Sequence, residues 1–145
     1  MYVCVFVRMY ICICYNLQAV IFEFQGLVEE ADVDSFNLPC YFPYEEEVKS
    51  IVREQGSFNL DTFESFEVNW DPSDDVNNKS FVFNKDRCGQ NVANCIRAVT
   101  EPTLASHFGN AVIDPLFARF ATLVAEHLAV EKTKYISLVI SMTNK

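Results

Sequence analysis

The chain has 145 residues, which is enough for one domain with its own hydrophobic core. Half of the residues are hydrophobic and 14% are aromatic, and this composition excludes an intrinsically disordered chain. The formal net charge of −9 disfavours nucleic acids and anionic membrane surfaces as partners.

The first 24 residues are mostly apolar. Two apolar runs, Met1–Val7 and Met9–Tyr15, flank Arg8, and each is far shorter than the ~20 residues of a membrane-spanning helix. No basic leader precedes them, so a signal peptide is disfavoured. Their β-branched and aromatic content favours a buried strand over a helix in residues 1–15. A gene-model artefact, such as translated intron, is the preferred explanation of residues 1–24, and membrane anchoring through them is the alternative.

Residues 34–37 offer two hard oxygen ligands. Asp34 and Asn37 lie three positions apart, and Phe36 places a backbone carbonyl between them. Mg²⁺ binds a few protein oxygens together with water, so this segment is a possible metal site. On spacing alone, Asp34 is better explained as the cap of a turn.

A helix and a strand are expected next. Pro43–Gln55 has acidic residues in its first turn and Gly56 after its end, as in many helices, although Tyr44 is a weak cap. Ser57–Trp70 alternates well enough for a strand. We expect Asp71–Asn78 to form an exposed loop and Phe81–Phe83 to fold back onto the core.

Residues 89–109 contain the strongest helical pattern. Apolar residues recur at helical spacing, at Val92, Cys95, Ile96 and Val99. Asn91 is the candidate cap, and Pro102 is expected to kink or restart the helix. Arg97 and Glu101 are four apart and predict a surface ion pair.

The C-terminal part predicts a second helix and a final strand. Residues 111–130 are apolar at helical spacing, with Pro115 near their start. A helix capped by Asp114, with Pro115 as its first residue, avoids the cost of an internal proline. Lys134–Thr143 is expected to form a buried strand.

The residues taken alone indicate no catalytic constellation. The sequence contains no Gly-rich phosphate loop, Gly-x-Ser-x-Gly turn or His-Glu-x-x-His motif. No cysteine pair has Cys-x-x-Cys spacing, and neither His107 nor His127 lies at a ligand spacing from a cysteine. We therefore expect reduced thiols and a cytoplasmic protein.

Five segments together resemble the C-terminal third of the plant SABATH family of carboxyl methyltransferases. They are Gly26–Glu30, Asp34–Pro39, Glu54–Phe58, Gly89–Gly109 and Glu131–Tyr135. Members of this family transfer a methyl group from S-adenosylmethionine to small carboxylic acids such as salicylate, jasmonate and benzoate, or to the ring nitrogens of xanthines. The resemblance divides the chain into a non-matching stretch, 1–24, and a matching part, 25–145.

The resemblance implies a fold and a set of site residues. The fold is the α/β, Rossmann-like methyltransferase fold, of which this chain is an α+β part with a helical cap. Its last strands, Thr62–Trp70 and Tyr135–Met142, are expected to pair antiparallel. Ile96, Val99 and Tyr135 are expected to line the acceptor pocket. The Asp-x-Phe-Asn motif of the family implies Mg²⁺ ligands at Asp34, Phe36 and Asn37.

The resemblance also implies what is missing. In the family, S-adenosylmethionine is bound by an N-terminal half, so we expect no cofactor-binding or catalytic residue here and a truncated chain that is inactive alone. A small carboxylic acid is the implied partner, and a homodimer is possible. The alternative is a non-catalytic binding or dimerisation module derived from the family.

Overall fold

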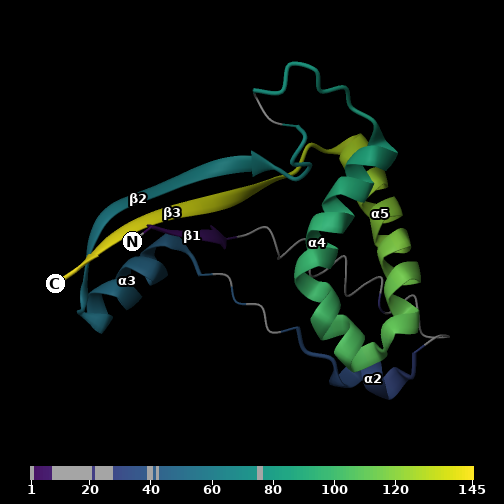
Figure 1. Ribbon diagram of the computed structural model, residues 1–145, viewed down its shortest axis with the longest axis horizontal. Coiled ribbons are helices and arrows are strands. Elements are labelled where there is room, and N and C mark those ends of the chain that lie inside the picture. Colours follow the sequence, from purple (N-terminus) through teal and green to yellow (C-terminus); the bar gives the residue numbers. More distant parts are fainter. Residues whose placement is uncertain (1, 8–20, 22–27, 39–40, 42, 75–76) are drawn as a thin grey trace.

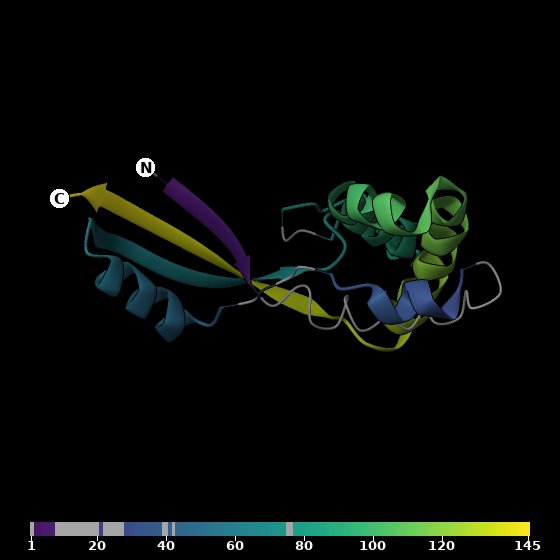
Figure 2. The same ribbon diagram turned by 90° about the horizontal axis from the view of Figure 1, so that it is seen from below.

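The computed structural model describes residues 2–7, 21, 28–38, 41, 43–74 and 77–145, and shows a sheet joined at one end to a helical hairpin (Figure 1). The elements are β1 (Tyr2–Val7), α2 (Glu30–Ser35), α3 (Glu45–Gln55), β2 (Phe58–Asn69), α4 (Lys85–Phe108), η1 (Asn110–Val112), α5 (Ile113–Val130) and β3 (Lys134–Asn144). In the orthogonal view, α3 covers one face of the sheet and α2 lies against the hairpin (Figure 2). No helix in the described ranges is long and apolar enough to cross a membrane.

The sheet has the strand order β1-β3-β2, with β3 antiparallel to both neighbours. Thr62 pairs with Ser141 and Asn69 with Lys134, so the expected antiparallel pair is confirmed. The first strand confirms the strand expectation for residues 2–7, whereas residues 8–15 lie outside the described part. Strand β3 lies between the other two and contains buried residues, whereas β2 has none.

Helix α3 begins and ends as its sequence indicates. Tyr44 is its N-cap without a side-chain hydrogen bond, and Gly56 ends it with φ of 76° in the left-handed region. The helix contacts β2, and the ammonium of Lys49 lies 5.0 Å from the centre of the Phe63 ring. None of its residues is fully buried, so α3 is held loosely in this part of the molecule.

Helix α4 begins four residues before the expected start at Gly89. Asn84 caps it by accepting a hydrogen bond from the Arg87 amide at 2.9 Å, so the expectation that Asn91 caps the helix is wrong. The helix does not restart at Pro102, because α4 continues through it to Phe108. Packing beyond the proline explains this, since Leu104 is fully buried and fixes the last turns. The expected kink at the proline stays a prediction.

Helix α5 begins at Ile113 after a short 3-10 turn, and its N-cap is Val112. Asp114 is therefore not the cap that the sequence predicts. Its carboxylate instead accepts from Arg97 of α4 at 2.8 Å. Pro115 is tolerated one position after Asp114 because the first amides of a helix have no intrahelical partner to lose.

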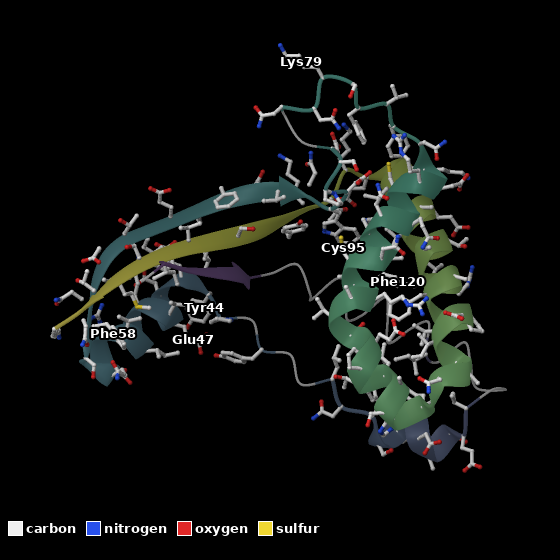
Figure 3. The ribbon with its side chains drawn as sticks, viewed as in Figure 1. Tyr44, Glu47, Phe58, Lys79, Cys95 and Phe120 are labelled. Carbon is white, nitrogen blue, oxygen red and sulfur yellow. The ribbon has the colours of Figure 1, made fainter. Side chains whose placement is uncertain are left out.

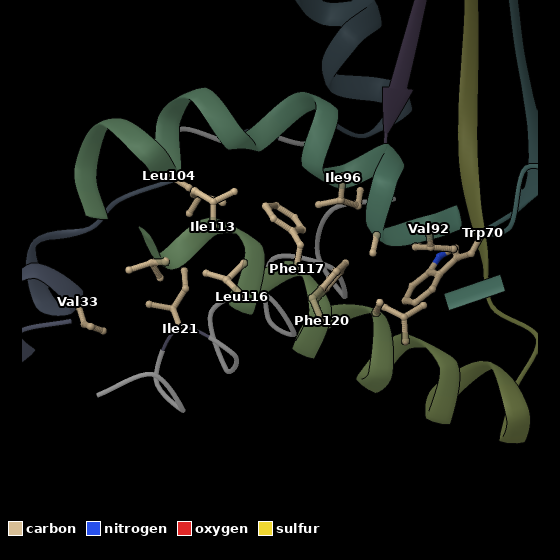
Figure 4. Close-up of a cluster of buried hydrophobic side chains, with 14 residues drawn as sticks. Ile21, Val33, Trp70, Val92, Ile96, Leu104, Ile113, Leu116, Phe117 and Phe120 are labelled. Carbon is tan, nitrogen blue, oxygen red and sulfur yellow. The ribbon is translucent and has the colours of Figure 1, made fainter. Parts of the chain in front are cut away.

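The two long helices approach most closely at Gly89. A Cβ atom at this position would lie 2.4 Å from the carbonyl oxygen of Ala121 and 2.8 Å from the Cβ of Ala125. Only glycine fits such a contact. The side chains between α4 and α5 form one apolar core, and Phe120 lies near its centre (Figures 3 and 4).

The core extends from Val33 of α2, across the hairpin, to Trp70 at the end of β2 (Figure 4). Ile21 is also buried in it, at 3% exposure. The segment after β2 departs from expectation. Asp71 is buried although Asp71–Asn78 was expected to be exposed, and Val82 and Phe83 are exposed although they were expected to pack on the core.

Candidate functional site

The three expected acceptor-pocket residues lie in different environments. Ile96 is 1% exposed and packs in the core between α4 and α5 (Figure 4). Tyr135, at the start of β3, is half-buried and packs against the same core. Val99 is 59% exposed on the surface of α4. The structure thus brings Ile96 and Tyr135 to one core and leaves Val99 outside it, and the shared pocket stays a prediction.

The three expected metal ligands lie at the end of α2. Asp34 and Asn37 are exposed, and Phe36 is the C-cap, with its amide donating to the Val33 carbonyl at 3.2 Å. The Phe36 ring lies 5.1 Å from the His107 ring and 4.9 Å from the Phe108 ring, centre to centre. In the part of the chain that the structure describes, no cluster of three His, Cys, Asp or Glu residues could hold a metal ion.

An open hollow of about 540 Å³ lies beside these residues, between α2 and the C-terminal half of α4. Its lining is mostly polar: Ser35, Phe36, Asn37, Pro102, Thr103, Ser106 and His107. His107 links α4 to α2, because its Nε2 lies 2.8 Å from the Asp32 carbonyl oxygen. A carbonyl oxygen only accepts, so this nitrogen carries the proton.

A second polar cluster, which the sequence did not predict, lies where the sheet meets the hairpin. Asp71, directly after Trp70, is 4% exposed. Its Oδ1 accepts from the Ser73 amide at 2.9 Å and from the Asn91 side chain at 3.1 Å. We refer to Asp71, Ser73, Cys88 and Asn91 as the Asp71 cluster. The Asp-Pro-Ser sequence, which favours a turn closed by the Asp side chain, is the signal that could have found it.

The Asp71 cluster contains a charged carboxylate and a neutral thiol. Burial alone raises the pKa of the Asp71 carboxyl, but hydrogen bonds from Cys88, Ser73 and Asn91 lower that pKa below its usual value. Burial, together with the hydrogen bond to Asp71, raises the pKa of the Cys88 thiol. Cys88 is therefore a protonated donor at neutral pH and not a nucleophile.

Trp70 makes a second connection at the same junction. Its amide donates to the Thr133 carbonyl at 3.2 Å, and its ring lies 5.3 Å from the ring of His127, centre to centre. His127 Nε2 lies 2.5 Å from the Thr133 hydroxyl. A small hollow of about 20 Å³ adjoins Trp70, Asp71 and Thr133. This volume admits a water molecule but no organic substrate.

An ion-pair network links the middle of α4 to the first turn of α5. Arg97 contacts Glu101 at 2.7 Å, which confirms the expected pair, and also Asp114 at 2.8 Å. Arg97 lowers the pKa of the Glu101 carboxyl through this hydrogen bond. Its guanidinium lies 5.6 Å from the centre of the Phe117 ring. The network is exposed and stabilises the hairpin rather than a reaction centre.

The described side chains form an apolar core with several polar contacts around it. The Cys88 thiol faces the Asp71 carboxylate, and each histidine is held by the backbone carbonyl or hydroxyl of a neighbouring segment. No nucleophile–base pair is formed among the side chains that the structure describes.

Comparisons with known proteins identify the family of this chain. The sequence model of SAM-dependent carboxyl methyltransferases, where SAM is S-adenosylmethionine, matches residues 8–145. The chain therefore belongs to this family. The match begins at residue 8, so it includes most of the stretch 1–24 that the resemblance left unmatched.

Two plant relatives show what share of the length of a family member this chain covers. Anthranilate O-methyltransferase 1 of Zea mays is 48% identical over 118 residues, which are 81% of this chain and 31% of that protein. Probable jasmonic acid carboxyl methyltransferase 2 of Theobroma cacao is 47% identical over 123 residues, which are 83% of this chain and 33% of that protein. The chain thus spans about a third of the length of these relatives.

A solved structure has the same fold. Loganic acid methyltransferase with SAH, S-adenosylhomocysteine, superposes with a TM-score of 0.69 over 90% of this chain and 35% of that chain, at 24% identity. The expected α/β methyltransferase fold is confirmed, and this chain is an α+β part of it.

Proposed function

We propose that this chain is the acceptor-binding part of an enzyme that methylates the carboxylate of a small organic acid. The observation that carries the proposal is the family match over residues 8–145. The names of the two relatives, an anthranilate and a probable jasmonic acid methyltransferase, suggest aromatic or aliphatic carboxylic acids as acceptors. Within this reaction the chain contributes the wall that orients the acid.

The described residues do not fit the cofactor, S-adenosylmethionine. A nucleotide cofactor needs a glycine-rich turn between a strand and a helix. Gly56 ends α3, Gly89 is packed against α5, and Gly109 follows α4, so none of these three forms such a turn. The cofactor supplies an electrophilic methyl group when bound to the whole enzyme. No step involving it is assigned to these residues, and we expect no turnover by this chain alone.

The proposed role of the acceptor wall is orientation. An ionised carboxylate is already a nucleophile and needs no general base, so the protein gains rate mainly by holding it in line with the methyl group. Correct orientation is worth about 7–11 kcal/mol in favourable cases. We assign Ile96, Val99 and Tyr135 to this wall. Val99 is 59% exposed on α4, so its side chain is accessible to a ligand.

We further propose that Asp34, the Phe36 carbonyl and Asn37 contribute to a weak Mg²⁺ site. The donor set fits a hard cation, since Asp34 and Asn37 are exposed at the C-terminal end of α2, where the helix dipole favours positive charge. Isothermal titration with MgCl₂ tests the site. Heat of binding that persists unchanged in Asp34→Ala would exclude this assignment.

A chimera tests the main proposal. Residues 25–145 of this chain replace the corresponding segment of Zea mays anthranilate O-methyltransferase 1, and transfer of a labelled methyl group is measured with anthranilate, benzoate and jasmonate. We expect activity, with Ile96→Ala raising the KM for the acid more than the KM for the cofactor. The exposed Ser106→Ala on the same helix is the matched control. A folded chimera without activity on any acid would contradict the proposal.

The same measurements decide between an enzyme segment and a non-catalytic module. A module is expected to bind a partner or itself without the cofactor half. Sedimentation of the isolated chain measures self-association directly, and a dimer together with an inactive chimera would favour the module. A cytoplasmic location is supported by the two described cysteines, Cys88 and Cys95, which are both unpaired. A fluorescent fusion protein tests this location.

A further inference from the structure

The sheet and the helical hairpin are two separately packed parts. Helix α4 packs against α5 along its length, and β3 packs against β1 and β2. The two parts are far apart over most of their length and meet where β2 ends and β3 begins (Figure 1). In the described ranges, neither α4 nor α5 makes an extensive contact with a strand. Among the described residues, this junction connects α4 to the start of β3 through Asp71, Trp70 and Thr133.

Asp71 occupies the centre of the junction. It follows the last residues of β2, and its carboxylate reaches the first two turns of α4 through Cys88 and Asn91. Asn91 also donates to the Ser73 hydroxyl at 3.3 Å, which closes a ring of contacts between the loop and the helix. The other carboxylate oxygen, Oδ2, is buried and has no nitrogen or oxygen donor among the described residues.

The two sides of the proposed acceptor wall belong to the two parts that this junction joins. Ile96 and Val99 are on α4, one to two turns beyond Asn91, whereas Tyr135 is on β3, two residues beyond Thr133. Trp70 touches both sides, since it packs in the hairpin core and its amide binds Thr133 (Figure 4). A rotation of α4 at the junction would change the spacing between Ile96 and Tyr135.

We propose that Asp71 is a positioning residue that fixes α4 against the start of β3 and thereby sets the width of the acceptor wall. The expected effect of Asp71 on binding of the acceptor rests on the proposed function. Its expected effect on the position of α4 rests on the hydrogen bonds alone. A carboxylate suits this role because it accepts several hydrogen bonds at once, two of them in fixed directions from a turn and a helix.

The first test uses the isolated chain and does not depend on activity. Asp71→Leu removes the acceptor at similar volume, Asp71→Asn keeps Oδ1 as an acceptor, and exposed Asp86→Leu is the matched control. We expect amide exchange in the first two turns of α4 to accelerate about tenfold in Asp71→Leu, with β2–β3 amides unchanged. Emission of Trp70, the one tryptophan of the chain, should shift to the red. Unchanged exchange in α4 would overturn the proposal.

The second test uses the chimera. In Asp71→Leu we expect the KM for the acid to rise about tenfold and the KM for the cofactor to stay within about twofold, because a misplaced wall affects only the acceptor. Asp71→Asn should remain close to wild type in both constants. Equal changes in both constants would show a merely structural role and overturn the proposal.

An inactive wild-type chimera would refute the proposed function, and amide exchange would then decide the role of Asp71. If Asp71→Leu does not fold, Asn91→Leu takes its place in both tests.

Discussion

The helical hairpin and strand β2 bury very different fractions of their apolar residues. Helices α4 and α5 contribute most of the core, with Phe120 and Leu104 completely buried. In the sheet, β2 has no fully buried residue, Phe66 is 46% exposed, and Ile51 of α3 is 54% exposed. The hairpin thus contributes most of the described core, whereas β2 and α3 carry apolar side chains on the surface.

The largest expected effect comes from the hairpin core. Phe120→Ala should lower the free energy of unfolding by about 3–5 kcal/mol, because it removes a fully buried ring and leaves a cavity. Phe66→Ala is the matched variant in the sheet and should cost less than about 1 kcal/mol. Denaturation in urea measures both. Equal losses would show that the sheet is as well packed as the hairpin.

Gly89 tests how closely the hairpin is packed. Replacement by alanine favours a helix by about 0.5–1 kcal/mol, but overpacking costs about 1–3 kcal/mol. The overpacking term should win, because the nearest atom is the backbone oxygen of Ala121 at 2.4 Å, which cannot move without α5. Gly89→Ala should therefore destabilise the chain, as measured by its Tm. A raised Tm would show that the helices separate easily.

Asn84 tests where the hairpin begins. Asn84→Ala should cost about 1 kcal/mol, because it removes the cap of α4. Asn94→Ala, exposed in the middle of the same helix, is the control and should change stability by less than about 0.5 kcal/mol. Amide exchange at Arg87 should accelerate only in Asn84→Ala. Acceleration in neither variant would place the start of α4 elsewhere.

Asp71 gives the smallest effect and tests the junction between the two parts. Its pKa is lowered in the folded chain, so its contribution is fully present above the unfolded pKa of about 3.9 and is lost as the pH falls through the lower folded pKa. Asp71→Asn has no such titration. The difference in free energy of unfolding between wild type and Asp71→Asn should be constant from pH 7 to about 5 and shrink below about pH 4. A constant difference down to pH 2 would contradict the assignment.

The sequence by itself determined the family and most of the elements, although it did not predict α2 and placed the start of α4 four residues late. Apolar spacing placed both long helices and β3, alternation placed β2, and Gly56 marked the end of α3, because periodicity and local backbone preference act within a few residues. Five local motifs were sufficient for the family, which the match over residues 8–145 confirms. The antiparallel pairing of β2 with β3 followed from that resemblance.

Only the tertiary structure decided which polar residues are buried and which apolar residues are exposed. Asp71 is buried because Asn91 and Cys88, distant in sequence, supply its hydrogen bonds, and the same contact removes Asn91 from the capping position that the sequence favours. Val99 continues the apolar stripe of α4 yet remains exposed, because the crossing at Gly89 fixes which face of the helix meets α5. Burial depends on contacts between distant segments, and these contacts are set by how whole helices cross rather than by local spacing.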